Sequence, residues 1–275
     1  MFRMAGLDLD GTLLRQDKSI SDYSREVIRR AAGTGCVIVP VTGRPLAGVP
    51  SAVKSLPGVR YCITSNGAAV YDLKDGKVLR EVLMGRETAL SVLEAARGTA
   101  LIREVFTGGW GYHVPQDYER LKKRFSGTPV MSYIDGSRKK TDCLEDFVRG
   151  CHRGLENISV MCGSFEDREK IREKLSRVKG INVILPWKTD LEITDGKAEK
   201  GDALLFLAES LGIRREETLA AGDSDNDLSL LKKAGIALAM GNASAHIREA
   251  ADYITEDNEH DGAARALERF ILEEN

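Results

Sequence analysis

The sequence lacks cysteine pairs, a histidine cluster and any long apolar run. Its five cysteines, at positions 36, 62, 143, 151 and 162, contain no Cys-x-x-Cys pair and have an odd count, so we expect free thiols. The four histidines lack the spacing of zinc ligands. No apolar stretch approaches the ~20 residues of a membrane span. Disulfide scaffolds, zinc modules and helical membrane anchors are therefore not expected.

The chain also has no large excess of positive or negative charge. The formal net charge of −2 gives no sign of a nucleic-acid or membrane surface. The chain enters an apolar strand at once, without the pattern of a signal peptide, so a cytoplasmic protein is expected. Its 275 residues exceed the usual size of one domain, which favours two. Nothing in the composition indicates an oligomeric state.

Two carboxylates stand at the end of the first apolar run. Met4 to Leu7 is followed by Asp8-Leu9-Asp10-Gly11-Thr12, which predicts a buried strand that delivers Asp8 and Asp10 to the carboxyl edge of a sheet. Two acids this close can share a phosphoryl transfer, one as nucleophile and the other as proton carrier, and can attract Mg²⁺. Taken alone, the same residues also fit an acidic turn.

A second acidic cluster far along the chain changes that balance. Thr218 to Ala221 is another short apolar run, and Gly222-Asp223-Ser224-Asp225-Asn226-Asp227 follows it directly. The acids match the first positions of an EF-hand loop, but that loop needs Gly at its sixth position and Glu at its twelfth. Leu228 and Ala234 occupy those places. The cluster is therefore better explained as a second strand that ends in carboxylates.

The ordered motifs of the chain resemble those of the haloacid dehalogenase-like phosphatases, Cof-type branch. The residues that carry the resemblance cover about 1–80 and 190–275, and they are Asp8 to Leu14, Thr42-Gly43-Arg44, Ser65-Asn66-Gly67-Ala68, Lys200-Gly201, Gly222 to Asp227, Gly241-Asn242-Ala243 and Asn258 to Gly262. The resemblance implies a phosphatase with a Rossmann-like core and a cap inserted between its second and third motifs.

Alternating patterns indicate the same organisation. The strands expected at Cys36–Val41 and Tyr61–Thr64, and the helix that precedes the first of them, predict a parallel α/β sheet. Between about 83 and 190 the pattern changes to hairpin-like strands and charged helices, which predicts a separate α+β module. We expect a core of residues 1–82 and 190–275 and an inserted cap of residues 83–189 that sets substrate specificity. The final helix is expected over Asp261 to Leu272.

The reaction assigns roles to the acids. Phosphoryl transfer needs an in-line nucleophile, charge neutralisation and a proton for the leaving group. Asp8, at the strand end, fits the nucleophile, and Asp10 fits the acid that later activates water. The resemblance implies the same roles, with the Asp10 backbone carbonyl on the metal. Asp8 and Asp223 are expected to bind Mg²⁺, and by resemblance Asp227 helps to hold the metal or its waters.

The phosphate oxygens need donors as well. The Thr42 hydroxyl and the Gly43 N–H suit one oxygen, although Thr-Gly pairs are also common in turns. Lys200 fits a cationic clamp, with Lys197 as its rival and a solvated side chain as the alternative. Asn226 is expected at the metal water or the phosphate.

Three further features leave alternatives open. Arg44 is a possible substrate contact or the partner of a core carboxylate, and Asn66 lies in a motif that a plain turn also explains. The insert's Trp110, Tyr112 and His113 favour packing over substrate contact.

The expected function is a magnesium-dependent phosphatase of small phosphorylated metabolites, sugar phosphates above all, acting through an aspartyl phosphate. A phosphomutase of related fold and a regulatory phosphate-binding protein with a vestigial site are the alternatives. The sequence does not name the substrate, because fold alone does not give function.

Overall fold

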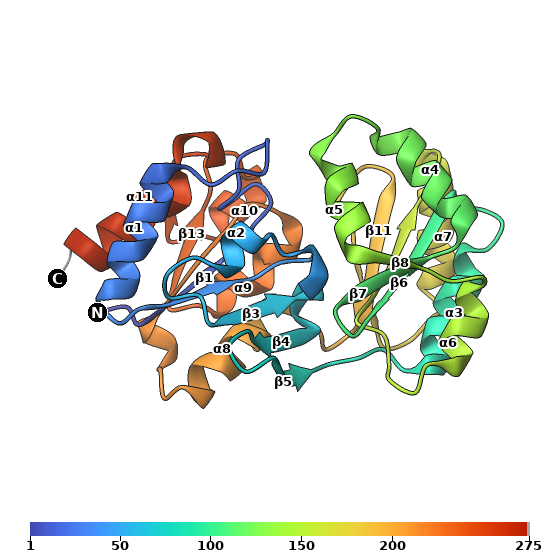
Figure 1. Cartoon of the computed structure of the whole chain (residues 1–275), viewed down its shortest axis with the longest axis horizontal. Helices are drawn as coiled ribbons and strands as arrows, with labels where there is room; N and C mark the ends of the chain where they lie inside the picture. The colour runs from blue at the N-terminus through green and yellow to red at the C-terminus, as the bar shows by residue number, and fades with distance from the viewer. Residues whose placement is uncertain (274–275) are drawn as a thin grey trace. The chain divides into compact units, whose positions relative to one another are not determined.

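The computed structural model describes residues 1–273 and divides the chain into two compact units (Figure 1). Unit 1 contains residues 1–43, 49–80 and the C-terminal part from residue 199. Unit 2 contains residues 81–198 and a short second segment, Arg44–Gly48. Among the described residues, no helix is long and apolar enough to cross a membrane.

A parallel sheet forms the centre of unit 1. Its strand order is β14-β13-β12-β1-β2, and its strands are β1 (Met4–Leu7), β2 (Val37–Pro40), β12 (Thr218–Gly222), β13 (Ile236–Ala239) and β14 (Tyr253–Ile254). All four neighbouring pairs run parallel. The expected Rossmann-like α/β core is confirmed, and β1 and β12 lie side by side at its centre. Both strands are buried on both faces, which is why they read as apolar runs.

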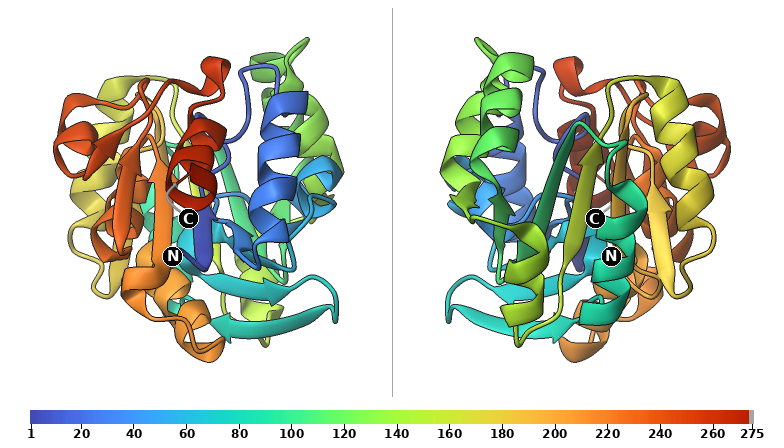
Figure 2. Two further views of the ribbon diagram at one scale, coloured as in Figure 1. Left: turned by 90° about the vertical axis from the view of Figure 1, so that its left-hand side faces the viewer. Right: turned by 90° about the vertical axis from the view of Figure 1, so that its right-hand side faces the viewer.

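Helices cover both faces of this sheet. On one face, α1 (Asp22–Gly33) and α11 (Gly262–Leu267) pack on Ala5 and Leu7. On the other face, α8 (Lys200–Ser210) and α9 (Leu228–Lys233) pack around Met4. The blue α1 and the red α11 lie beside each other in the views of Figures 1 and 2. The expected final helix is present: α11 continues directly into a π-helical segment, Glu268–Glu273.

One strand does not join the parallel sheet as expected. β3 (Tyr61–Thr64) pairs antiparallel with β4 (Ala69–Asp72), and β5 (Lys77–Glu81) completes a separate three-stranded sheet. A single parallel bridge, Val41 to Ile63, links β3 to the end of β2. The reason is local. The turn at Ser65–Gly67 has positive φ at all three residues, so the chain folds back into a hairpin and makes no crossover helix.

Unit 2 is built on a six-stranded sheet of order β10-β11-β9-β6-β7-β8. Its strands are β6 (Ile102–Thr107), β7 (Trp110–His113), β8 (Arg138–Lys140), β9 (Asn157–Met161), β10 (Ile181–Ile184) and β11 (Asp190–Asp195). One face packs on α3 (Arg86–Ala96), α6 (Leu144–Gly150) and α7 (Phe165–Leu175). At Ile102 and Met161 the other face packs on α4 (Pro115–Phe125) and α5 (Pro129–Ser137). The sequence pattern does not predict α4, α5, α6 or β8.

Short elements complete the chain. They are η1 (Leu46–Gly48), α2 (Ser51–Lys54), η2 (Ser65–Gly67), η3 (Arg215–Glu217), η4 (Asp225–Asp227), α10 (Ala245–Glu249) and η5 (Asn258–His260).

Candidate active site

The end of β1 holds Asp8 in a fixed position. Its backbone N–H donates to the Ala221 carbonyl of β12 at 3.0 Å, and its carbonyl accepts from Leu13 N–H at 3.2 Å. The residue is 4% exposed. Asp10 is in a different environment: its Oδ1 accepts a hydrogen bond from Lys18 Nζ at 2.7 Å, and both side chains are partly exposed. The neighbouring acids are therefore a buried one and a partly solvated one.

The loop after β12 brings two more carboxylates to the same edge. Asp227 is fully buried, and its Oδ2 accepts from the backbone N–H groups of Asp223 and Ser224 at 3.0 and 3.1 Å. The Asp223 Oδ1 accepts from the Thr12 hydroxyl at 3.1 Å. Gly11 has φ +87°, and a Cβ there would lie 2.4 Å from Asp223 Oδ2, so the close approach of the two loops requires glycine.

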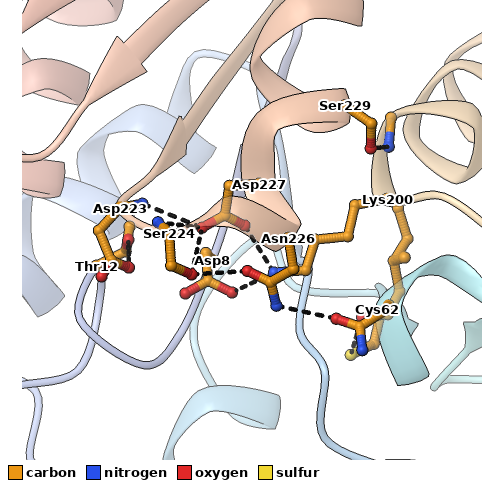
Figure 3. A network of polar contacts seen from close by, with 12 residues as sticks. Asp8, Thr12, Cys62, Lys200, Asp223, Ser224, Asn226, Asp227 and Ser229 are labelled. Carbon is orange, nitrogen blue, oxygen red and sulfur yellow. Dashed lines mark hydrogen bonds and ion pairs between the residues drawn. The ribbon is translucent and has the colours of Figure 1, made fainter. Parts of the chain in front are cut away.

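Lys200 joins the two loops. Its Nζ donates to Asp8 Oδ1 at 2.8 Å and to Asp227 Oδ1 at 2.6 Å, and the residue is 1% exposed. Figure 3 shows its long side chain reaching from α8 to these two acids. A cation at the first residue of a helix opposes the helix dipole, so its position there reflects its partners and not helix stability. The role of Lys200 as a cationic clamp, preferred over Lys197, stays a prediction. The two ion pairs of Lys200 support it.

Burial and like charge perturb the acids. Burial raises the pKa of Asp8 well above its usual value, and the carboxylates of Asp227 and Asp223 add to the effect, while Lys200 opposes it. Burial, with Asp227 next, raises the pKa of Asp223 to about 6. Burial alone would lower the pKa of Lys200, but Asp227 and Asp8 outweigh it and hold this pKa above its usual value. The lysine is therefore charged throughout the physiological range.

The acids suit a hard divalent cation. Asp8, Asp223 and Asp227 each place one carboxylate oxygen within 4.8 Å of the others. With all three acids ionised, the carboxylates and the Lys200 ammonium would carry two net negative charges, which a divalent cation would neutralise. The Asp10 carboxylate is outside this group of ligand atoms. That position is compatible with a contact through its backbone carbonyl, as the family resemblance implies.

The expected phosphate donors border the acids. Thr42 is 1% exposed; its backbone N–H donates to the Ile63 carbonyl at 2.9 Å, and its own carbonyl accepts from Asn66 N–H at 3.1 Å. The Asn226 amide donates to Asn66 Oδ1 at 2.9 Å and accepts from the Ser224 hydroxyl at 2.7 Å. The structure therefore brings Asn66 and Asn226, which the sequence had considered separately, into direct contact.

Arg44 is assigned to unit 2, although it follows Thr42 and Gly43 directly. Its guanidinium lies over the Tyr133 ring, 4.7 Å from the centroid, and its Nη1 donates to the Gly48 carbonyl at 3.2 Å. The structure therefore gives Arg44 partners within unit 2, and its contact with substrate stays a prediction.

Three residues of the site had no role in the sequence analysis. Thr12 positions Asp223, as described above. Asn242 donates to the Gly11 carbonyl and Asn258 to the Leu14 carbonyl, both at 2.9 Å, so these two residues brace the loop that follows β1. The motifs that contain them signalled importance, but not these bonds, which join positions more than 200 residues apart.

Comparison with known proteins identifies the family. The family model of the haloacid dehalogenase-like hydrolases matches residues 6–267. The chain is 29% identical to the 5-amino-6-(5-phospho-D-ribitylamino)uracil phosphatase YcsE of Bacillus subtilis, over 98% of this chain and 96% of that protein. It is 28% identical to the phosphatase YwpJ of Bacillus subtilis, over 98% of this chain and 100% of the relative.

Solved structures agree. A haloacid dehalogenase-like hydrolase from Bacteroides thetaiotaomicron superposes with a TM-score of 0.84 at 28% identity, covering 98% of this chain and 99% of the other. A second one, from Bacillus subtilis, gives 0.83 at 26% identity, with 98% and 100% covered. The chain belongs to the haloacid dehalogenase-like hydrolases, and it is a phosphatase.

Proposed function

We propose that this phosphatase is magnesium-dependent and hydrolyses small phosphorylated metabolites, sugar phosphates among them, through an aspartyl phosphate on Asp8. The observation that carries the proposal is that Lys200 donates hydrogen bonds to both Asp8 and Asp227. At the same edge of the sheet, an Asp223 carboxylate oxygen lies within 4.8 Å of oxygens of these two acids. A nucleophile, a fixed cation and further metal-ligand oxygens are thus assembled in one place.

Asp8, Asp223 and Asp227, with the Asp10 carbonyl, would hold the Mg²⁺ ion. When bound, it would offset the repulsion between a carboxylate and a phosphate dianion, and it would keep the buried acids ionised. Asp227 anchors the loop as well, since its two oxygens already accept from Lys200 and from two backbone N–H groups.

The chemistry then proceeds in two displacements. An Asp8 oxygen forms a bond to phosphorus as the bond to the leaving oxygen breaks, and Asp10 gives that oxygen a proton. Asp10 next takes a proton from water as the water attacks phosphorus, and the bond between Asp8 and phosphorus breaks. Lys200 offsets the negative charge at the attacking group, and Thr42, Gly43 and Asn226 donate to the phosphate oxygens. The ion pair of Asp10 with Lys18 must open before Asp10 can act as an acid.

The substrate class is the finer part of the proposal. The relative YcsE is named for a substrate in which a phosphate is attached to a ribityl chain. That name supports a small, hydroxylated phosphomonoester for this chain and does not identify it. Unit 2, which contains the expected cap, is proposed to select among such substrates.

Turnover of p-nitrophenyl phosphate tests this proposal. We expect activity with Mg²⁺, loss on chelation and recovery when Mg²⁺ is restored. Asp8→Asn should abolish turnover and keep the fold, because the amide has the same shape without the anion. Asp75→Asn, which changes a half-exposed carboxylate of unit 1 outside the site, is the matched control. Metal-independent activity, or substantial activity in Asp8→Asn, would contradict the proposal.

A further inference from the structure

Four non-glycine residues among residues 1–273 have a left-handed backbone, and they are Lys18, Ser65, Asn66 and Asp261. Such a backbone costs roughly 1–3 kcal/mol and persists where the surroundings hold the residue in place, often near a functional site. Ser65 and Asn66 form the turn beside Thr42, and Lys18 is the partner of Asp10. Asp261, with φ +61°, is the one of the four that has no place in the site described above.

The Asp261 side chain does not serve its own helix. Asp261 precedes α11, but its carboxylate makes no capping bond there. Its Oδ1 instead accepts from the Ser21 hydroxyl at 2.6 Å and the Ser24 hydroxyl at 3.1 Å, and both of its oxygens accept from Arg15 Nη2 at 3.2 Å. Ser21 is the N-cap of α1. One carboxylate therefore contacts the chain at Arg15 and at Ser21, on either side of Lys18.

The chain between these two contacts is a turn, residues 15–21, which we call the lysine turn. Lys18 N–H donates to the Arg15 carbonyl at 2.9 Å, which closes it. Ile20 is its only apolar side chain and is buried in the core of unit 1 near one end. At the other end, Arg15 forms its ion pair with Asp261. Polar contacts, those of Asp261 foremost, therefore fix where the lysine turn lies.

The position of Lys18 sets that of the Asp10 carboxylate. Lys18 Nζ donates to Asp10 Oδ1 at 2.7 Å, and the two side chains are 32% and 41% exposed. An exposed ion pair between two freely moving side chains contributes only ~0–1 kcal/mol, because fixing both of them costs conformational entropy. The lysine turn already fixes the Lys18 backbone, which lowers that cost. A proton carrier must stay within hydrogen-bond reach of the leaving oxygen, so a fixed Asp10 suits its proposed role.

We propose that Asp261 is a positioning residue for the proton transfers of Asp10: it fixes the lysine turn, and through Lys18 this turn sets where the Asp10 carboxylate lies. All of these residues belong to unit 1. The inference rests on the proposed function, in which Asp10 protonates the leaving oxygen. When the pair with Lys18 opens, Asp10 acts from the position that the turn has given it. Asp261 acts through Lys18 and takes no part in bond making.

The experiment compares two carboxylates that join the C-terminal segment to α1. Glu268 accepts from Tyr23 at 2.5 Å and from Arg30 at 2.9 Å, and neither partner lies in the lysine turn. Glu268→Ala is therefore the matched control for Asp261→Gly, in which glycine accepts the left-handed backbone without strain. Lys18→Met removes the ammonium group that Asp10 contacts. Each is made in the full-length protein.

The measurement is kcat/KM for glycerol 3-phosphate, whose leaving group needs a proton, and for p-nitrophenyl phosphate, whose leaving group does not. For Asp261→Gly we expect a fall of about tenfold with the first and of less than about twofold with the second. Lys18→Met should give the same pattern with little change in the urea midpoint, because an exposed ion pair contributes little to stability.

The control and a double variant separate positioning from a structural role. Asp261→Gly and Glu268→Ala should both lower the urea midpoint, but Glu268→Ala should keep the ratio of the two kcat/KM values. If Asp261 acts through Lys18, adding Asp261→Gly to Lys18→Met should leave that ratio as it is in Lys18→Met alone.

Three results would overturn the inference. One is an Asp261→Gly variant in which the ratio of the two kcat/KM values is unchanged, and another is an equal change of this ratio in Glu268→Ala. The third is an additive effect of Asp261→Gly and Lys18→Met on the ratio. Failure of the proposed function looks different: Asp10→Asn would then lose activity equally with both substrates, or the unaltered protein would hydrolyse neither.

Discussion

The two acids at the end of β1 differ in their surroundings, and their proposed roles follow the difference. Asp8 is buried and held by Lys200, which suits an attacking group that must not move. Asp10 is partly exposed and paired with Lys18, so it can exchange protons with solvent once that pair opens. The same residue type thus takes two roles because its environment differs.

Asp10→Asn should show which step needs the acid. General acid catalysis contributes roughly 10²–10⁴-fold, so turnover of alkyl phosphates should fall by that order. The loss should be at least about tenfold smaller with p-nitrophenyl phosphate, whose leaving group departs without a proton. The measurement is kcat for a series of leaving groups of increasing pKa. A uniform loss across the series would remove Asp10 from the acid role.

At a pH above the pKa of Asp223, the charged Asp223 carboxylate should lower the free energy of unfolding of the metal-free protein. Its pKa rises from 3.8 to about 6 on folding, so the folded state holds a proton that the unfolded state has lost between these values. The free energy of unfolding therefore falls as pH rises from about 4 to 6 and stays lower above that range.

Asp223→Asn should remove this penalty. In the presence of a chelator at pH 7.5, the variant should be more stable than the unaltered protein by on the order of 2 kcal/mol, and the difference should vanish below pH 4. Urea unfolding across that pH range measures it. The same variant should bind Mg²⁺ more weakly. If Asp223→Asn were less stable than the unaltered protein at pH 7.5 without metal, the buried Asp223 carboxylate would not be destabilising.

The sequence alone predicts some residues of the site but not others. Asp8 and Asp223 follow apolar runs, and the structure places both at the carboxyl edge of β1 and β12. Thr12, Asn242 and Asn258 could not be given roles, because their partners lie far away in the sequence and only the folded chain brings them together. The pairing of Asn66 with Asn226 was hidden for the same reason.

At the scale of elements, turns decide where the strands go. The strand β3 has the apolar character of a central parallel strand, which explains the wrong prediction, but the three left-handed residues after it return the chain into β4. The helices α4 and α5 escaped prediction because each buries only two residues, and one of the two is polar: Asp117 beside Leu121 in α4, and Ser137 beside Ile134 in α5. Burial, which makes a pattern visible, is limited there to a few positions.

Gly67→Ala should disturb the site through one such turn. Gly67 has φ +93°, and a Cβ there would lie 2.3 Å from the Glu199 carbonyl, next to Lys200. We expect a loss of more than about 2 kcal/mol in the free energy of unfolding and lower activity, since Lys200 must shift. Gly76→Ala is the control, because Gly76 has φ +64° but open space around it.

The Gly76→Ala control measures the cost of the left-handed backbone conformation alone, because an added Cβ meets no other atom there. Gly76→Ala should cost only about 1 kcal/mol and leave activity unchanged. Urea unfolding and p-nitrophenyl phosphate turnover measure both effects. Equal losses of stability with full activity in both variants would show that the turn at Ser65–Gly67 does not position Lys200.

For the whole molecule, the sequence predicted two modules from a change of pattern near residues 83 and 190, and the compact units divide at residues 80/81 and 198/199. The assignment of Arg44–Gly48 to unit 2 could not be foreseen, because it depends on packing against Tyr133 and on the bond from Ala47 N–H to the Gly109 carbonyl. No local pattern encodes those contacts.

Replacing residues 81–198 with a flexible Gly/Ser linker should leave a folded unit 1, because its sheet and helices form their own core. That protein should still bind Mg²⁺ and vanadate. Because the inserted module is the proposed source of selectivity and of water exclusion, the shortened protein should lose discrimination among metabolites and much of its rate. Calorimetry and a substrate panel measure both. Undiminished selectivity would show that unit 1 alone recognises the substrate.

The central claim is the covalent intermediate on Asp8. Acid quenching during turnover of a ³²P-labelled sugar phosphate, followed by peptide mapping, tests it most directly. We predict a base-labile phosphoryl group on the peptide that contains Asp8, at the Asp8 carboxylate, and none in Asp8→Asn. Turnover without any trapped phosphoryl group and with inversion at phosphorus, or a label on another residue, would contradict it.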